Sequence, residues 1–269
     1  MSDNQTELTA RLELAREIAA RAGELTLRYF QDPQLAVERK SDASPVTVAD
    51  REAEQLMRAE IAAHFSSDGI IGEEFGEQPG DSSYTWVLDP IDGTKSFIHG
   101  VPLYGTLVGL TRSDEAVAGV IQMAALDESV FAATGQGAWH QRGNEPPARA
   151  QVSTQAKLAE SLFCTSADTA FAERADPDGP AAYRRLAEAA GLARTWGDCY
   201  GYFLVATGRA DVMVDPVFNI WDACAAKPVI EEAGGKFTDW KGEATIHHGE
   251  GVATNGRVHD QVLAVLAGR

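Results

Sequence analysis

One stretch of the sequence places two carboxylates and a hydroxyl at the end of an apolar run. The run 86–88, Trp-Val-Leu, is followed by Asp-Pro-Ile-Asp-Gly-Thr at residues 89–94. This pattern predicts a buried strand that ends in a turn and carries the acids at its carboxyl end. Ligands of open α/β sheets bind at that end of the strands, and carboxylate oxygens suit hard cations such as Mg²⁺ or Mn²⁺. The stretch therefore predicts a metal site.

The glycine and threonine that complete this stretch predict a place for an anion. Gly93 lets the chain approach a ligand closely, and a helix that begins near Thr94 would offer free N–H groups to a phosphate. An Asx-turn with a helix cap would explain the same residues without any chemistry. A calcium-binding EF-hand loop does not fit, because it needs acids at alternate positions and a glutamate where Gly100 stands.

Further acids stand in three other segments of the chain. Glu73 and Glu74 follow the apolar pair at 70–71, so one acid-tipped strand precedes another. Asp50 and Asp222 each stand near the start of a predicted helix. From spacing alone, helix capping is the favoured interpretation of Asp50, whereas capping and a metal role are evenly matched for Asp222.

The apolar periodicity predicts a mixed α/β protein of two lobes. Residues 1–150 are expected to form a metal-binding α+β lobe with an antiparallel sheet, and residues 151–269 an α/β lobe that completes the site. Helices are predicted over 5–30, 47–65, 181–190, 201–208, 219–232 and 258–267, and strands over 104–110, 116–123, 129–134, 162–165 and 210–214. The polar segment 140–150 is predicted as an exposed hairpin and linker, and 76–83 as a surface loop with the potential to act as a lid.

Composition and charge exclude several classes of protein. Of the 269 residues, 44% are apolar and 23% charged, as in ordinary globular proteins, and the net charge of −17 argues against a nucleic-acid partner. An anionic substrate would also be repelled unless metal ions reversed the local sign. No membrane helix or secretory signal is visible, so a cytoplasmic protein without a membrane partner is expected. The three cysteines lack the paired spacing of a disulfide framework or a zinc site.

Three separated segments resemble the inositol monophosphatase family of Mg²⁺-dependent, lithium-sensitive phosphatases. They are Gly72-Glu73-Glu74, the segment 89–94, and Trp221-Asp222-x-x-Ala225-Ala226 with the downstream run 231–235. The resemblance extends over about residues 37–256, with the segments in the order of the family. It implies an α/β (α+β) fold, a layered α/β/α/β/α sandwich, and usually a homodimer.

The resemblance also implies roles for individual residues, and for Asp50 it replaces the capping interpretation. Two or three Mg²⁺ ions, with Mn²⁺ as a possible substitute, would be bound by Glu73, Asp89, the carbonyl of Ile91, Asp92 and Asp222. Asp50 and Thr94 would orient and deprotonate an attacking water, and Glu74 is included among the catalytic residues. The substrate would contact Gly93, Thr94, Lys95, Asp198 and Asp215. Such a set of oxygen donors holds cations that neutralise a phosphate and lower the pKa of a bound water.

Within the family, the sequence is more similar to histidinol-phosphate phosphatases than to inositol phosphatases. The segments 92–97, 100–106 and 196–200 carry this resemblance, whereas inositol phosphatases usually have Thr-Asn in place of Lys95-Ser96. Histidinol phosphate has an ammonium group and an imidazole that inositol phosphate lacks, so the acids at 198 and 215 are candidates to bind those cations. The leading hypothesis is hydrolysis of L-histidinol phosphate. The alternatives are an inositol-1-phosphatase or broader sugar- or nucleotide-phosphate monoesterase, and a non-catalytic metal-binding protein.

Overall fold

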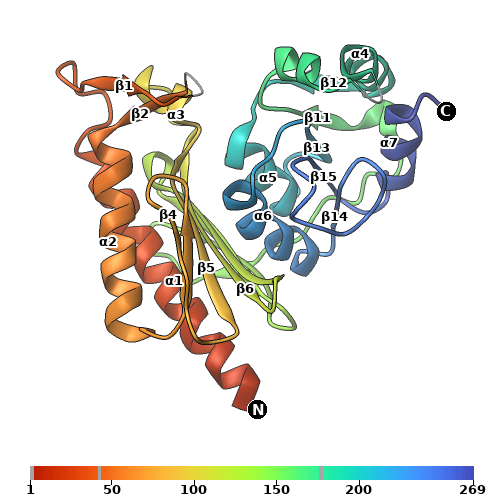
Figure 1. The fold of residues 1–269 in the computed structure, drawn as a ribbon. Coiled ribbons are helices and arrows are strands. Elements are labelled where there is room, and N and C mark those ends of the chain that lie inside the picture. Colours follow the sequence, from red (N-terminus) through yellow and green to blue (C-terminus); the bar gives the residue numbers. More distant parts are fainter. Residues whose placement is uncertain (1–2, 42–43, 176–177) are drawn as a thin grey trace.

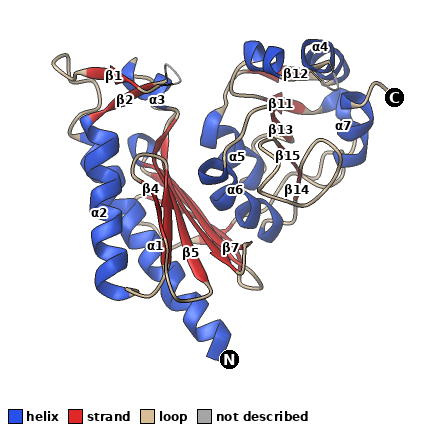
Figure 2. Ribbon diagram, viewed as in Figure 1, coloured by secondary structure: helices blue, strands red, loops and turns tan. Residues whose placement is uncertain are grey.

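The computed structural model describes residues 3–41, 44–175 and 178–269. Its elements are stacked in five layers, in the order helix, sheet, helix, sheet, helix (Figure 1). The outer helices of the first layer are α1 (Asp3–Leu27) and α2 (Val48–His64), those between the sheets are α5 (Asp198–Ala206) and α6 (Ile220–Glu232), and those of the last layer are α4 (Gly179–Ala189) and α7 (His259–Leu266). The layered sandwich expected from the sequence is therefore confirmed (Figure 2).

The larger sheet has eight strands and contains the predicted antiparallel meander. In chain order its strands are β3 (Gly69–Gly72), β4 (Gly76–Gln78), β5 (Tyr84–Asp92), β6 (Gly105–Arg112), β7 (Glu115–Met123), β8 (Glu128–Ala133), β9 (Gly137–Arg142) and β10 (Ala148–Arg149). They are arranged in the order β10-β9-β8-β7-β6-β5-β3-β4. The pairing of β9 with β10 confirms the hairpin predicted over 140–150.

The remaining strands form the smaller sheet and a short hairpin. In sheet order the smaller sheet contains β12 (Leu192–Arg194), β11 (Leu162–Cys164), β13 (Val212–Asp215), β15 (Gly251–Thr254) and β14 (Lys236–Thr238). The hairpin pairs β1 (Val37–Arg39) with β2 (Pro45–Thr47). Strands β11 and β13 were predicted from their apolar runs, whereas β12, β14 and β15 were not predicted. The two sheets lie on either side of residue 150, and the division into lobes stays a prediction.

The helices agree with the predicted pattern, with shifts at their ends. Helix α5 begins at Asp198, three residues before the predicted start, and α3 (Thr94–Ile98) is the predicted helix near Thr94, limited to five residues. Short 3₁₀ helices are η1 (Ala124–Leu126), η2 (Leu158–Glu160) and η3 (Asp168–Glu173). Among the helices of the described segments, none combines the length and apolar character needed to cross a bilayer.

Strands β3 and β5 bring two acid-bearing ends to the same edge of the larger sheet. They pair in parallel, with Gly72 opposite Leu88, so the residues that follow each strand emerge side by side. Along β5 and β6 the register shifts between Asp89 and Asp92, where three steps on β5 match two on β6. A bulge of this kind turns the strand locally and re-aims its side chains. Both acids of β5 are thereby placed at the rim of the sheet.

The segment 76–83 is not a lid. Its first residues form β4, which pairs antiparallel with β3 and leads away from the acid-bearing edge. The backbone N–H groups of Asp81 and Ser82 then bond to the carbonyl oxygen of Ser67, at the opposite end of the sheet. The interpretation of this loop as a lid is wrong because its polar composition indicates only exposure, not the end of the sheet at which it lies.

Helix α6 packs against the larger sheet through two glycines. Gly109 and Gly119 face each other across β6 and β7. A Cβ added at Gly119 would lie 2.1 Å from the carbonyl oxygen of Ala225, and one at Gly109 would lie 2.6 Å from Sγ of Cys224. Because side chains are absent at these positions, α6 approaches the sheet closely, and its first turn reaches the rim where β5 ends.

We expect Gly119→Ala to destabilise the protein by roughly 2–3 kcal/mol, since the added methyl meets backbone that has no room to move. Chemical denaturation of both proteins measures the difference. Gly69→Ala is the matched control, because the nearest atom to a Cβ there is Oγ1 of the Thr85 side chain, at 3.1 Å. Equal stabilities for Gly119→Ala and the unaltered protein would contradict the close packing of α6.

Candidate active site

Four of the predicted acids converge on one cavity. Asp89 and Asp92 come from the end of β5 and Asp222 from the first turn of α6, and one carboxylate oxygen of each lies within 4.8 Å of the others. Glu73, directly after β3, lines the same cavity. The cavity has a volume of about 240 Å³ and is lined by Ser44, Pro45, Glu73, Asp89, Ile91, Asp92, Gly93, Thr94, Lys95, Asp198, Asn219, Trp221 and Asp222. Acids far apart in the sequence are therefore neighbours in space.

Burial and mutual repulsion raise the pKa values of the three aspartates. For Asp89, burial is the largest cause and the charges of nearby acids add to it, so its pKa lies well above the usual range. Burial likewise raises the pKa of Asp92, with the charges of Asp198 and Asp222 contributing. The pKa of Asp222 is raised to about 7, again mainly by burial. Such a cluster resists full ionisation on its own, so a cation in its midst would be strongly stabilised.

Asp50 and Asp222 occupy equivalent positions in two capping boxes. Oδ2 of Asp50 accepts hydrogen bonds from the backbone N–H and the hydroxyl of Thr47, at 2.8 and 2.7 Å. Oδ2 of Asp222 accepts from the backbone N–H of Asn219 at 2.8 Å. Both aspartates therefore cap the helices in which they stand. It does not compete with a role in the site, because the cap uses one carboxylate oxygen and leaves the other.

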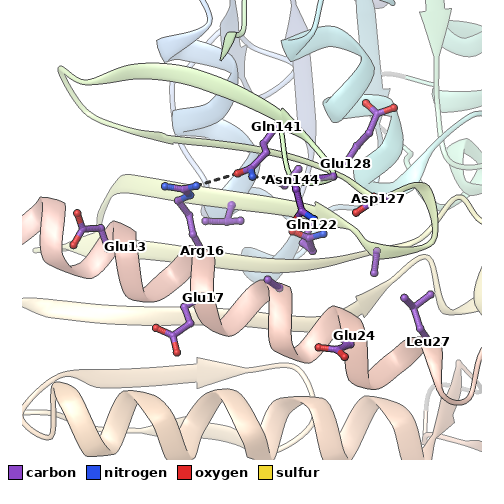
Figure 3. A pocket seen from close by; sticks show the side chains of 15 residues that line it. Glu13, Arg16, Glu17, Glu24, Leu27, Gln122, Asp127, Glu128, Gln141 and Asn144 are labelled. Atoms are coloured by element: carbon purple, nitrogen blue, oxygen red, sulfur yellow. Dashed lines mark hydrogen bonds between the residues drawn. The ribbon is translucent and has the colours of Figure 1, made fainter. Parts of the chain in front are cut away.

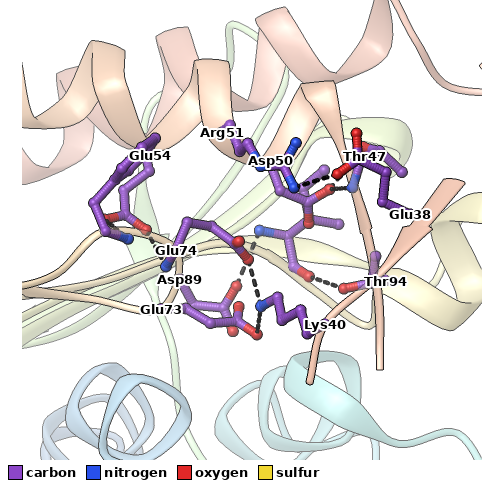
Figure 4. Close-up of polar contacts among 12 residues, drawn as sticks. Glu38, Lys40, Thr47, Asp50, Arg51, Glu54, Glu73, Glu74, Asp89 and Thr94 are labelled. Atoms are coloured by element: carbon purple, nitrogen blue, oxygen red, sulfur yellow. Dashed lines mark hydrogen bonds and ion pairs between the residues drawn. The ribbon is translucent and has the colours of Figure 1, made fainter. Parts of the chain in front are cut away.

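The second oxygen of Asp50 differs from the capping oxygen in its surroundings. Its Oδ1 is buried without a hydrogen bond in the described part of the chain, and burial raises the pKa of Asp50 to about 6 against the opposing bonds from Thr47. The hydroxyl of Thr94 donates to the carbonyl of Ile91 at 3.0 Å (Figure 4). Since that hydroxyl has a single hydrogen, Thr94 does not donate to Asp50 in this structure, and the predicted joint role of the two residues in activating a water stays a prediction.

Lys40 bridges the two consecutive glutamates (Figure 4). Its Nζ lies 2.7 Å from Oε1 of Glu73 and 2.5 Å from Oε1 of Glu74. Burial opposes the charge on Lys40, but the bonds to both glutamates outweigh it and raise the pKa of the ammonium group. Burial raises the pKa of Glu74 to about 7. Glu74 contacts Lys40 and, like Asp50, is not among the residues that line the cavity, so its catalytic role stays a prediction.

Glu54, a fully buried residue of α2, fixes the turn that carries these glutamates. Its Oε2 accepts from the backbone N–H of Glu74 at 2.7 Å, and its Oε1 accepts from that of Phe75 at 3.2 Å and from Nε of Arg58 at 2.7 Å. A Cβ at Gly72 would lie 1.9 Å from Oε1 of Glu54, so only glycine fits between β3 and this carboxylate. The position of Glu73 therefore depends on a residue outside the cavity.

Asp198 lies at the cavity and is linked to the acid cluster through the next residue. It starts α5 with φ +50, and the backbone N–H of Cys199 donates to Oδ2 of Asp92 at 2.5 Å. A Cβ at Gly93 would lie 3.0 Å from Oδ2 of Asp198, which shows how near the two segments come. Burial raises the pKa of Asp198, and the charge of Lys95, also at the cavity, opposes the shift.

Asp215 does not line the cavity, and its assignment as a substrate-binding residue is corrected. It is 2% exposed, and its Oδ1 accepts from the backbone N–H of Ser166 at 2.9 Å and the hydroxyl of Thr165 at 3.2 Å. Its Oδ2 accepts from the hydroxyl of Tyr202 at 3.2 Å. Oγ of Ser166 in turn accepts from the backbone N–H of Asp198 at 2.8 Å. Asp215 thus supports the loop that holds Asp198.

A larger cavity, of about 610 Å³, lies between α1 and the face of the eight-stranded sheet (Figure 3). Its lining includes the acids Glu13, Glu17, Glu24 and Asp127 and one arginine, Arg16. Arg16 itself donates to Oε1 of Gln141 at 3.1 Å. None of the predicted site residues of the described chain lines this cavity, so size alone does not identify the candidate active site.

Sequence reasoning missed three residues that shape the site. They are Lys40, Glu54 and Ser166, none of which is among the site residues predicted from the sequence. A buried position for Glu54 was detectable in principle, because it stands between Ala53 and Met57 on the apolar face of α2. The partners of Lys40 and Ser166 are distant in the sequence, and no local pattern indicates them.

Comparison with known proteins agrees with this geometry. The profile of the inositol monophosphatase family matches residues 7–268. The chain belongs to the inositol monophosphatase family. It is 44% identical over 260 residues to a histidinol-phosphatase of Chlorobaculum parvum, covering 96% of this chain and 97% of that protein, and 37% identical over 255 residues to one of Mycobacterium tuberculosis, covering 95% and 97%. The solved inositol monophosphatase of Zymomonas mobilis superposes with a TM-score of 0.83 at 29% identity, covering 96% and 98% of the two chains.

Family members are metal-dependent phosphatases, typically with Mg²⁺, and the residues present here fit such an ion. Three carboxylates, of which that of Asp89 is on a buried residue and those of Asp92 and Asp222 on half-buried ones, lie within 4.8 Å of one another, as shared ligands of a cation would. Burial, with the charges of nearby acids, raises the pKa values of all three, and a bound cation would favour their charged forms. Mg²⁺ and Mn²⁺ prefer carboxylate oxygens, and the described cavity presents these from two layers of the sandwich.

We expect the metal-free protein to lose stability as the pH rises from about 4 to about 7. The folded-state pKa values of Asp50, about 6, and Asp222, about 7, lie above those of an unfolded chain, so their ionisation disfavours the fold. Mg²⁺ should raise the melting temperature more at neutral than at acidic pH, as thermal melts with chelator or Mg²⁺ would measure. Asp222→Asn should flatten the pH dependence without metal. A Mg²⁺ effect of equal size at both pH values would contradict the electrostatic account.

Proposed function

We propose that this protein hydrolyses L-histidinol phosphate to L-histidinol and phosphate, a step of histidine biosynthesis. The observation that carries the substrate is Asp198, whose carboxylate faces the same cavity as the acid cluster and suits an ammonium group. The histidinol-phosphatases to which the chain is 35–44% identical, over nearly its whole length, support the same activity. Inositol phosphate lacks a cationic group, so it would leave Asp198 without a matching charge.

The metal ligands proposed are Glu73, Asp89, the carbonyl of Ile91, Asp92 and Asp222. Bound Mg²⁺ would neutralise the phosphate and lower the pKa of a water for attack on phosphorus. Two or three ions, and replacement by Mn²⁺, are part of the proposal. The support for the set is that all five residues line one cavity, at the junction of β3, β5 and α6.

The chain's own groups would bind the phosphate and move the proton. Gly93, Thr94 and Lys95 line the cavity. The backbone N–H groups of the first two and the ammonium of Lys95 would suit the phosphate oxygens. The oxygen of water bonds to phosphorus while the ester P–O bond breaks, and the leaving oxygen takes up a proton from solvent. Asp50 is suited to accept the water's proton, directly or through the hydroxyl of Thr94, because its Oδ1 is unpartnered and its pKa is about 6.

Three further properties are proposed on the family resemblance. The protein acts in the cytoplasm on a small phosphorylated substrate, forms a homodimer, and is inhibited by lithium. The sequence match to the family over residues 7–268 supports all three.

We expect kcat/KM for histidinol phosphate to exceed that for inositol 1-phosphate by at least about tenfold, which corresponds to about 1.4 kcal/mol of transition-state preference. Phosphate release from both substrates by the purified protein with Mg²⁺ measures the ratio. A ratio that favours inositol phosphate tenfold would contradict the proposed substrate. It would favour the alternative, an inositol-1-phosphatase or broader sugar- or nucleotide-phosphate monoesterase, which the fold shared with the Zymomonas mobilis enzyme supports.

Two substitutions separate chemistry from substrate choice. Asp92→Asn should reduce phosphate release from every substrate by at least about 10²-fold, because a metal ligand is weakened without loss of volume. Asp198→Asn should raise KM for histidinol phosphate roughly tenfold or more and leave inositol 1-phosphate nearly unchanged. Equal losses on both substrates in Asp198→Asn would contradict its role in substrate choice. Activity that survives chelation and Asp92→Asn would contradict the metal mechanism.

A further inference from the structure

The ammonium group of Lys40 lies where two chain segments meet. Lys40 directly follows β1 and its backbone N–H donates to the carbonyl of Ser44 at 2.9 Å, across the hairpin. Its side chain extends from there to the turn after β3, where Nζ is 2.7 Å from Glu73 and 2.5 Å from Glu74 (Figure 4). The Lys40 side chain is 22% exposed and that of Glu74 only 5%, so water screens these charges less than on an open surface.

Glu73 has two possible cationic partners at the same carboxylate. It lines the cavity with the three clustered aspartates, and its charge is among the causes that raise the pKa values of Asp89 and Asp222. A divalent ion coordinated by Glu73 would stand within a few ångströms of the Lys40 ammonium. Like charges at such a distance repel strongly inside a protein. The lysine occupies Oε1 of Glu73, and its charge repels an ion at the same carboxylate, so the lysine and the ion compete for Glu73.

We propose that Lys40 is a built-in counter-cation, which occupies Glu73 in the metal-free protein and leaves when a divalent cation binds there. It stabilises the metal-free fold and lowers the affinity of the Glu73 position for metal. This inference rests on the proposed metal site. It adds a residue that no part of the proposed reaction requires.

The hairpin that carries Lys40 permits the change. All three residues of β1 are exposed, and three residue pairs join it to β2. Few buried contacts would be lost if this strand shifted, which is the property of segments that open at low cost. The lysine side chain itself has a flexible four-carbon stem, so its ammonium can leave Glu73 even with the backbone in place.

The proposal is tested by isothermal titration calorimetry, in which MnCl₂ is added to chelator-treated protein and the Mn²⁺ affinity is measured. Lys40→Met keeps the length of the side chain and removes the charge. We expect its weakest Mn²⁺ site to bind roughly tenfold more tightly than in the unaltered protein, as removal of one charged hydrogen-bonded competitor predicts. The metal-free melting temperature of Lys40→Met should fall, because Glu73 and Glu74 lose their partner.

Lys95→Met is the matched control, since Lys95 lines the same cavity but is not paired with Glu73 in the described structure. Lys95→Met also removes one positive charge near the cavity, so it measures how much the loss of a nearby charge alone changes the Mn²⁺ affinity. The proposal requires a clearly larger gain in Lys40→Met than in Lys95→Met. Lys40→Arg keeps the cation, and its Mn²⁺ affinity should stay near that of the unaltered protein.

The outcomes distinguish this inference from the proposed function. Absence of Mn²⁺ binding to the unaltered protein would overturn both. Binding by the unaltered protein, with equal or weaker affinity in Lys40→Met, would overturn the role of Lys40 and leave the metal site intact. Equal gains in Lys40→Met and Lys95→Met would likewise overturn it, because charge alone would explain them.

A measurement on the unaltered protein removes any dependence on how the variants fold. Amine acetylation, quantified by mass spectrometry, reports how accessible each lysine is. Saturating Mg²⁺ should increase the acetylation rate of Lys40 several-fold, with exposed Lys157 as internal reference. A rate for Lys40 that is unchanged or lower with Mg²⁺ would overturn the proposal.

Discussion

The repulsion between carboxylates buried in one small cavity is the constraint on which the rest of the structure depends. One carboxylate oxygen of each of Asp89, Asp92 and Asp222 lies within 4.8 Å of the others, and burial together with the charges of nearby acids raises the pKa of all three. An arrangement of this kind is unfavourable without a cation, so the scaffold must be strong enough to maintain it. Because folding has already brought these carboxylates together, a divalent ion that binds among them relieves their repulsion, and this relief contributes to its affinity.

Several rigid contacts hold the acids in place. The parallel pairing of β3 with β5 sets the first two acid-bearing ends together, and the bulge after Asp89 aims its side chain at the rim. Helix α6 reaches the same rim because Gly109 and Gly119 let it pack closely on the sheet. Glu54 fixes the turn of Glu73 from behind. Each contact comes from the core, which leaves the cavity itself free for ions and substrate.

The fold and much of the candidate site were predictable from local patterns. Acids at the ends of apolar runs indicated the sheet edge, and the order of three segments indicated the family. Capping and function were treated as alternatives for Asp50 and Asp222, yet the structure shows that both residues cap with one oxygen, which spacing alone does not reveal. Long-range contacts could not be predicted at all: the pairing of Lys40 with Glu73 joins residues 33 apart, and the burial of Asp215 depends on Ser166 and Tyr202.

The central claim is that these acids bind divalent cations together. The most direct measurement is the anomalous scattering of Mn²⁺ in crystals of the protein grown or soaked with MnCl₂. We predict at least one anomalous peak at coordination distance, about 2.0–2.6 Å, from carboxylate oxygens of Asp89, Asp92 and Asp222. A fully ordered cavity with no peak among these three residues at millimolar Mn²⁺ would contradict the account.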